Sequence, residues 1–284
     1  MLDPRHLKTF AAICETGSFE QAATRVHVTP SAVSQRMRAL SEAAGGALFA
    51  RLHPAEPTPL GRRLWRHAQE AAALEAALMA DLGRVGGAAP VTVALPADVL
   101  ATWGIGALAE AAGLRFTVRI DDQDHSAELL RRGEVSAAVS AERGPLPGCD
   151  AYVLAPMRYR AVCAPDFAAR WFPDGPTEAA LAAAPSLRFN AKDTLQLQWI
   201  AALGLSADPP VHTIGATDAF REATLLGMGW GLNPEALVAR DLAAGRLVEV
   251  APSPLDVPLW WQVARSASDL LAPLTERLRR ASRA

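Results

Sequence analysis

The chain has 284 residues, half of them hydrophobic and a fifth charged, a composition that predicts a globular protein of two or three domains. Its net charge of −2 does not suggest a protein that binds nucleic acid over its whole surface. Its three cysteines, Cys14, Cys149 and Cys163, are scattered along the chain, which argues against a disulfide framework. Because no apolar run suits a signal peptide or a membrane span, we expect no membrane partner and a cytoplasmic protein with reduced thiols.

The charge is unevenly distributed along the chain. Residues 1–70 hold nine Lys and Arg against six Asp and Glu, a net +3, whereas the remainder holds 19 against 24, a net −5. A basic N-terminal part joined to an acidic body suits a DNA-binding unit with a second function attached.

Start signals for three short helices lie in the first 44 residues. Asp3-Pro4 begins the first, Ser18 with Gln21 forms a capping box for the second, and Thr29-Pro30 begins the third. Each helix has one apolar face, and a tight Val26-His27-Val28 link separates the second from the third. This pattern predicts a helix-turn-helix.

The third helix has a polar face opposite its apolar one. Short hydroxyls there let the backbone enter a DNA major groove, glutamine can bond adenine, and arginine can bond guanine or phosphate. A solvated surface is the alternative for any lone helix, but the three-helix context favours DNA. Arginines of a following β-wing would contact phosphates. The expected DNA-binding residues are Thr29, Ser31, Ser34, Gln35, Arg36, Arg38, Arg51 and Arg62.

A long helix follows the wing. Thr58 caps it, and an apolar stripe at a mean spacing of about 3.7 residues continues to about Leu82. Packing against the same helix of a second subunit is the sharper prediction, and packing on the following domain is the alternative. The glycine-rich segment 83–90 then predicts a short linker.

From Val91 the pattern alternates between strands and helices, which predicts an α/β body with parallel sheets. Its length favours two lobes with a ligand cleft between them. We therefore expect a winged helix-turn-helix domain over 1–58, a dimerisation helix and hinge over 59–89, and an effector domain over 90–284. Lobe I would comprise about 90–158 and 259–284, and lobe II about 159–258.

These features together resemble the LysR-type transcriptional regulators over essentially the whole chain. The motifs that carry the resemblance are the helix-turn-helix, Leu48-Phe49-Ala50-Arg51, Thr58-Pro59-Leu60-Gly61 and the glycine-rich 227–234. More narrowly, 97–103, 129–135 together with Val139-Ser140, and 167–175 resemble the ArgP/LysG branch. That resemblance implies a periplasmic-binding-protein-like effector domain that senses lysine or arginine and controls a basic amino acid exporter gene.

A free basic amino acid needs donors for its carboxylate and acceptors for its cations. The helix beginning at Asp98 offers backbone N–H groups, and three aspartates after a strand offer negative charge. Helix capping is the alternative for Asp124 and for Thr217-Asp218. The expected effector-binding residues are Asp98, Thr102, Asp121, Asp122, Asp124, Ser140, Thr217 and Asp218.

Three other functions are alternatives to a regulator that responds to a basic amino acid. An enzyme is disfavoured because the chain has no nucleophile elbow, P-loop, metalloprotease or dinucleotide motif, so we expect no cofactor and no metal. A regulator for another amino acid or metabolite, and an architectural DNA-binding protein with a ligand-free body, remain open. We expect a homo-oligomer, dimeric or tetrameric, that binds double-stranded promoter DNA and a small-molecule effector.

Overall fold

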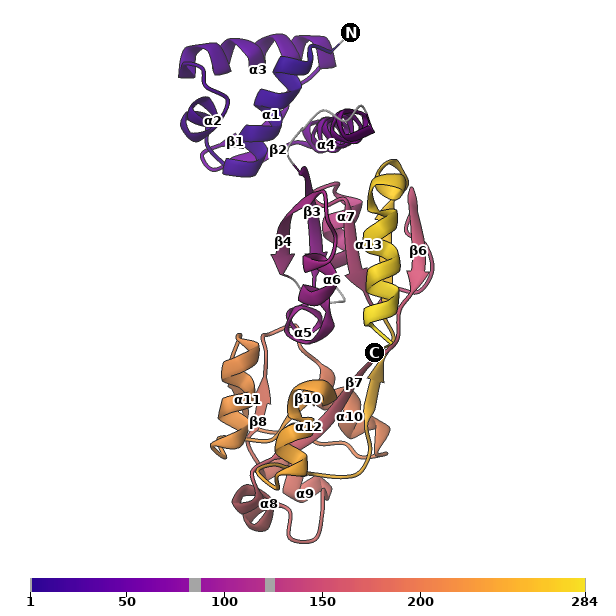
Figure 1. Cartoon of the computed structure of the whole chain (residues 1–284). Helices are drawn as coiled ribbons and strands as arrows, with labels where there is room; N and C mark the ends of the chain where they lie inside the picture. Colours follow the sequence, from indigo (N-terminus) through magenta and orange to yellow (C-terminus); the bar gives the residue numbers. More distant parts are fainter. Residues whose placement is uncertain (1, 82–87, 121–125, 284) are drawn as a thin grey trace.

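The computed structural model describes residues 2–81, 88–120 and 126–283, and Figure 1 shows its three parts along one axis. The N-terminal head contains α1 (Pro4–Thr16), α2 (Phe19–Arg25) and α3 (Pro30–Ala44), followed by the antiparallel wing strands β1 (Phe49–Leu52) and β2 (Ala55–Pro57). The predicted helix starts are confirmed, since Ser18 Oγ accepts from the Gln21 backbone N–H at 3.3 Å and Thr29 Oγ1 from that of Ala32 at 3.2 Å. Only half of the expected capping box forms, because the Ser18 backbone N–H donates to Thr16 Oγ1. The three apolar faces meet in one core around Phe10, which is fully buried.

Helix α4 (Pro59–Asp81) links the head to the body. Its N-terminal half buries Leu64, Trp65 and Ala68 in the core of the head. Further along the predicted apolar stripe, Leu74 is 65% exposed and Leu78 is 55% exposed. This half of the stripe has no cover within the described part of the chain, which favours a second copy as its partner.

The start of α4 is tied to the segment before the wing. Thr58 Oγ1 donates to the Ala47 carbonyl at 2.8 Å and accepts from the Gly61 backbone N–H at 3.0 Å. A Cβ added to Gly61 would lie 2.1 Å from the Leu48 carbonyl oxygen, a distance that only a backbone shift could relieve.

We therefore expect Gly61→Ala to destabilise the head by about 2 kcal/mol or more, because steric overlap with backbone is among the costly classes of substitution. Hydrogen exchange of the amides of residues 4–62 in the full-length chain would measure it. Gly106→Ala is the matched control, since no atom lies within 4 Å of the added Cβ in α6 (Ile105–Ala109). Equal protection of the head in both variants would contradict the expectation.

Lobe I is a five-stranded sheet with the order β4-β3-β5-β13-β6. Its strands are β3 (Ala89–Leu95), β4 (Leu114–Ile120), β5 (Ala137–Ser140), β6 (Cys149–Val153) and β13 (Trp260–Ala264). Its helical segments are α5 (Ala97–Val99), a π-helical turn (Leu100–Gly104), α6, α7 (Ser126–Arg131), the 3₁₀ turn Arg265–Ala267 and α13 (Ser268–Ala281). Trp261 anchors α13, because its indole is fully buried and its Nε1 donates to Thr275 Oγ1 at 2.9 Å.

Lobe II is built around β7 (Met157–Cys163), which pairs antiparallel with three strands, β10 (Gly231–Pro234), β11 (Val248–Glu249) and β12 (Leu255–Val257). Strands β8 (Ser186–Arg188) and β9 (Val211–Thr213) form a parallel pair beside them. The helices of this lobe are α8 (Pro165–Trp171), α9 (Glu178–Ala183), α10 (Leu195–Ala202), α11 (Thr217–Leu225) and α12 (Glu235–Ala243).

Two expectations for the body require correction. The sheet of lobe I is mixed rather than parallel, because β13 pairs antiparallel with β5 and β6, whereas β3 pairs parallel with β4 and β5. The sheet around β7 is antiparallel, because β7 runs antiparallel to each of its three neighbours. The helix expected to begin at Asp98 begins at Ala97, is interrupted by the π-helical turn and ends at Ala109. Chain-distant pairings such as that of β13 with β5 leave no local pattern in the sequence, and they decide strand direction.

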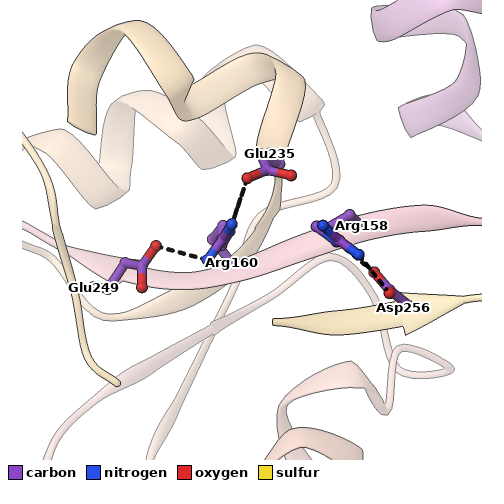
Figure 2. Close-up of polar contacts among 5 residues, drawn as sticks. All are labelled: Arg158, Arg160, Glu235, Glu249 and Asp256. Atoms are coloured by element: carbon purple, nitrogen blue, oxygen red, sulfur yellow. Dashed lines mark hydrogen bonds and ion pairs between the residues drawn. The ribbon is translucent and has the colours of Figure 1, made fainter. Parts of the chain in front are cut away.

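Two ion-pair groups fasten the exposed side of β7, as Figure 2 shows. Arg158 holds Asp256 of β12 through two hydrogen bonds of 2.8 and 2.9 Å, and this guanidinium keeps the pKa of the Asp256 carboxyl below its ordinary value. Arg160 bridges Glu235 at the start of α12 and Glu249 of β11, each at 3.0 Å. These partly exposed pairs fix strand register and contribute little stability individually.

Candidate functional site

The candidate DNA-reading surface is the outer face of α3. Ser31, Ser34, Gln35 and Arg38 are all exposed, as the spacing predicts. Ser34 Oγ donates to the Pro30 carbonyl at 3.1 Å, which satisfies the hydroxyl locally. Because small side chains flank one long amide and one arginine, this face suits insertion into a major groove.

Arg36 is placed differently from its neighbours. Its Nη1 donates to the buried Thr9 Oγ1 of α1 at 2.9 Å, and the side chain is only partly exposed. In this arrangement Arg36 helps to fasten α3 to α1. Substituting it would therefore disturb the packing of the head as well as any contact with DNA.

The wing arginines also make contacts within the chain. Arg51 pairs with Glu56 across the wing hairpin, and Arg62 Nη1 donates to the Pro57 carbonyl at 3.0 Å. Arg51 lies in the wing and Arg62 in the first turns of α4. A phosphate contact would require Arg51 to leave the Glu56 carboxylate. His27 occupies the left-handed region, with φ 55°, in the turn between α2 and α3.

A cleft between the lobes is the candidate ligand site, with about 680 Å³ of unfilled space that is partly open to solvent. Lobe I contributes the segment after β3, including Asp98, and lobe II contributes β7, β10 and the starts of α10 and α11. Polar and charged side chains that converge between apolar walls are typical of a small-molecule site. The lining residues are Pro96, Ala97, Asp98, Tyr159, Phe189, Lys192, Asp193, Thr194, Leu195, Gln198, Thr217, Phe220, Leu232, Asn233 and Pro234.

One hydrogen bond in this cleft joins the two lobes. The Tyr159 hydroxyl of β7 donates to Asp98 Oδ2 of α5 at 2.8 Å. The bond places a carboxylate where both lobes meet, so a cation bound there would contact both of them. Asp193 has a different role, because its two oxygens accept from the Phe189 and Leu195 backbone N–H groups at 2.8 and 3.0 Å.

Thr217 also lines the cleft, as the first residue of α11 and not as its cap. The N-cap residue is Ala216, which has no side chain that could bond the first backbone N–H groups of the helix. The positive end of α11 therefore faces the cleft and suits an anionic group such as a carboxylate. Asp218, the next residue, is exposed and does not line the cleft.

The other expected effector residues lie elsewhere. Thr102 Oγ1 donates to the Asp98 carbonyl at 2.7 Å, so its hydroxyl serves the π-helical turn and does not line the cleft. Ser140 is fully buried at the end of β5, and its Oγ has no partner in the described part of the chain. The triple aspartate, Asp121, Asp122 and Asp124, lies outside the described residues.

Several lining residues were missed by the sequence analysis. The segment 190–195 follows β8 with a run of polar residues, the same strand-end signal that drew attention to 121–124. Asn233 is a lone polar residue in a glycine-rich apolar strand, which is a weaker signal. Their convergence depends on β8 and β10 lying near one another, joined by the Ser186–Trp230 bridge.

Three notable side chains outside the cleft belong to the buried core. Trp199 and Trp230 are fully buried core residues, with ring centroids 5.3 Å apart. Cys163 is also fully buried in the core, where burial raises the pKa of its thiol to about 12, and it does not line the cleft. Within residues 2–81, 88–120 and 126–283, no helix is long and apolar enough to cross a membrane, and no His, Cys, Asp and Glu cluster could hold a metal ion.

A helix-turn-helix head joined by a long helix to two lobes around a polar cleft defines a ligand-responsive DNA-binding regulator. Family comparisons agree: residues 4–62 match the bacterial regulatory helix-turn-helix proteins of the lysR family, and residues 88–284 match the LysR substrate binding domain. The chain belongs to the LysR family of transcriptional regulators.

Three similar proteins are all LysG or ArgP regulators. The chain is 39% identical over 288 residues to the lysine export transcriptional regulatory protein LysG of Corynebacterium efficiens, covering 100% of this chain and 99% of that one. It is similar to the crystal structure of ArgP from Mycobacterium tuberculosis, with a TM-score of 0.86, 41% identity and coverage of 99% and 98%. It also matches full-length LysG of Corynebacterium glutamicum with bound effector Arg, with a TM-score of 0.74, 35% identity and the same coverage.

Proposed function

We propose that this regulator binds lysine or arginine between its lobes and thereby controls a gene for basic amino acid export. The observation that carries the proposal is the Asp98 carboxylate, held at the lobe junction by the Tyr159 hydroxyl. The uncapped start of α11 adds a place for the carboxylate of the amino acid. Relatives named for lysine export, or solved with arginine bound, support the same effector class.

Effector binding would control DNA binding through thermodynamic linkage between the cleft and the heads. An effector that contacts both lobes stabilises one arrangement of them, and it shifts the placement of the heads only if it binds the two arrangements with different affinity. We propose a homo-oligomer, dimeric or tetrameric, formed through α4 and working in the cytoplasm without enzymatic activity. Paired heads would bind a partly palindromic promoter site whose half-sites are about one helical turn apart or a multiple of it.

A thermal-shift panel of the purified chain with each of the twenty amino acids tests the effector. A ligand at about 100 times its dissociation constant stabilises the native state by about 2.7 kcal/mol, which raises the melting temperature visibly. A rise with lysine or arginine alone supports the proposal. A rise with a different amino acid would identify that amino acid as the effector. An unchanged melting temperature with all twenty would favour another metabolite as the effector, or the architectural DNA-binding alternative.

The DNA-reading face is tested by Gln35→Ala. Loss of a bidentate contact with a base costs about 1–3 kcal/mol, so we expect at least a fivefold loss of affinity for a site selected from random DNA with the wild-type chain. Fluorescence anisotropy would measure it, with Glu42→Gln as a control on the far part of α3. Unchanged affinity for the selected site would remove Gln35 from the interface. Gln35 is a cleaner probe than Arg36, whose substitution also breaks the contact with Thr9.

A further inference from the structure

Asn233 is a buried polar residue in the wall of the cleft. It lies in β10 between Leu232 and Pro234, lines the cleft, and is only 2% exposed. Neither the fastening of β7 nor the lobe-joining contact of Asp98 and Tyr159 uses its side chain. A primary amide kept at such a position needs partners for both its nitrogen and its oxygen.

The orientation of this amide is fixed by Thr224 of α11. Thr224 is fully buried, and its hydroxyl donates its single proton to the Phe220 carbonyl at 2.9 Å. The same oxygen lies 3.3 Å from the Asn233 side-chain nitrogen. Because the hydroxyl proton is already committed, the amide must donate to Thr224, so Nδ2 faces α11 and Oδ1 faces away from it.

The amide oxygen is left without a donor. No hydrogen bond to Asn233 Oδ1 forms within the described ranges, and this atom is not among the unpartnered polar atoms that are sealed from solvent. An acceptor that lines the cleft and has no donor costs free energy if no water reaches it. Such an acceptor is available to an N–H group of a ligand.

We propose that Asn233 Oδ1 accepts a hydrogen bond from a protonated nitrogen of the effector, with Thr224 as the positioning residue that aims the amide. The inference rests on the proposed function, since it requires a ligand in the cleft that carries N–H donors. It gives the site a second, neutral acceptor besides Asp98, which suits a ligand that carries two cationic groups. A buried acceptor also rejects analogues that lack the donor more strongly than an apolar wall would.

The test is calorimetric titration of the full-length chain with L-lysine and with L-arginine. Asn233→Leu removes the acceptor at similar volume, and we expect at least a tenfold rise in dissociation constant. Thr224→Val, which leaves the amide without its anchor, should raise the constant by a smaller factor, and Thr224→Ser should restore affinity. Leu197→Ala, an exposed residue of α10 outside the lining, is the control. Circular dichroism and melting temperature without ligand report whether each variant folds, and Asn233→Ala replaces the leucine variant if that one does not.

The outcomes separate this inference from the proposed function. If lysine or arginine binds the wild-type chain and Asn233→Leu binds it within twofold, the inference is overturned and the effector assignment stands. If the wild-type chain binds only another amino acid, the effector assignment fails, and the same variants titrated with that amino acid decide the role of Asn233. If none of the twenty binds, both are overturned.

Discussion

Asp98→Asn is expected to weaken binding of lysine and arginine by about 10- to 150-fold. A hydrogen bond to a charged partner contributes about 1.5–3 kcal/mol, and the substitution removes the negative charge while keeping the size of the side chain. The loss should appear as a higher dissociation constant in calorimetric titration. It should also appear as a smaller rise in melting temperature at a fixed ligand concentration.

Two further variants make this result specific. Asp218→Asn is the matched control, because it also converts a carboxylate to an amide near the cleft but lies exposed outside the lining. Tyr159→Phe removes only the hydroxyl that donates to Asp98, so its effect should be smaller than that of Asp98→Asn. Affinity within twofold of wild type in Asp98→Asn would remove this carboxylate from effector recognition.

Combined substitution of Leu74→Asp and Leu78→Asp is expected to give a monomer that binds operator DNA at least 100-fold more weakly. Both leucines are more than half exposed on α4, and the proposed subunit interface would bury them. A carboxylate on each side of such an interface would have to be desolvated without a partner, which costs several kcal/mol. Loss of the paired head then removes the gain of about 10²–10⁴ from bivalent binding.

Light scattering after size-exclusion chromatography measures the first effect, and anisotropy on the selected DNA site measures the second. Leu197→Asp serves as the matched control, since this leucine of lobe II is 46% exposed and lies away from α4. An unchanged molar mass in the double variant would mean that α4 packs elsewhere, and the oligomer interface would have to be sought on the lobes.

The head shows how much local sequence can determine. Asp3, Ser18 and Thr29 each accept a backbone N–H at a helix start, and Thr58 does the same for α4. A capping side chain and the backbone N–H that it accepts lie within four residues of each other, so a short stretch of sequence is enough to predict the helix start.

The cleft shows what local sequence cannot determine. Thr102 and Asp218 lie at or near helix starts, which is why the sequence predicts them as effector-binding residues. In the structure, Thr102 bonds its own helix and Asp218 does not line the cleft. Whether a strand-end residue faces a cleft depends on the direction and neighbours of its strand. Those depend in turn on pairings between residues far apart in the chain, such as β10 with β7.

Sequence alone therefore determined the helix starts, the exposed polar face of α3, the stripe on α4 and the resemblance to LysR regulators, because each depends on residues within a few turns of one another. Tertiary structure alone decided that Arg36 binds Thr9, that Asp98 meets Tyr159 at the lobe junction, and that one main sheet is mixed and the other antiparallel. It also brought the segment 190–195 and Asn233 into the cleft. The physical reason is that these contacts join segments tens of residues apart, which only the packed core brings within hydrogen-bond distance.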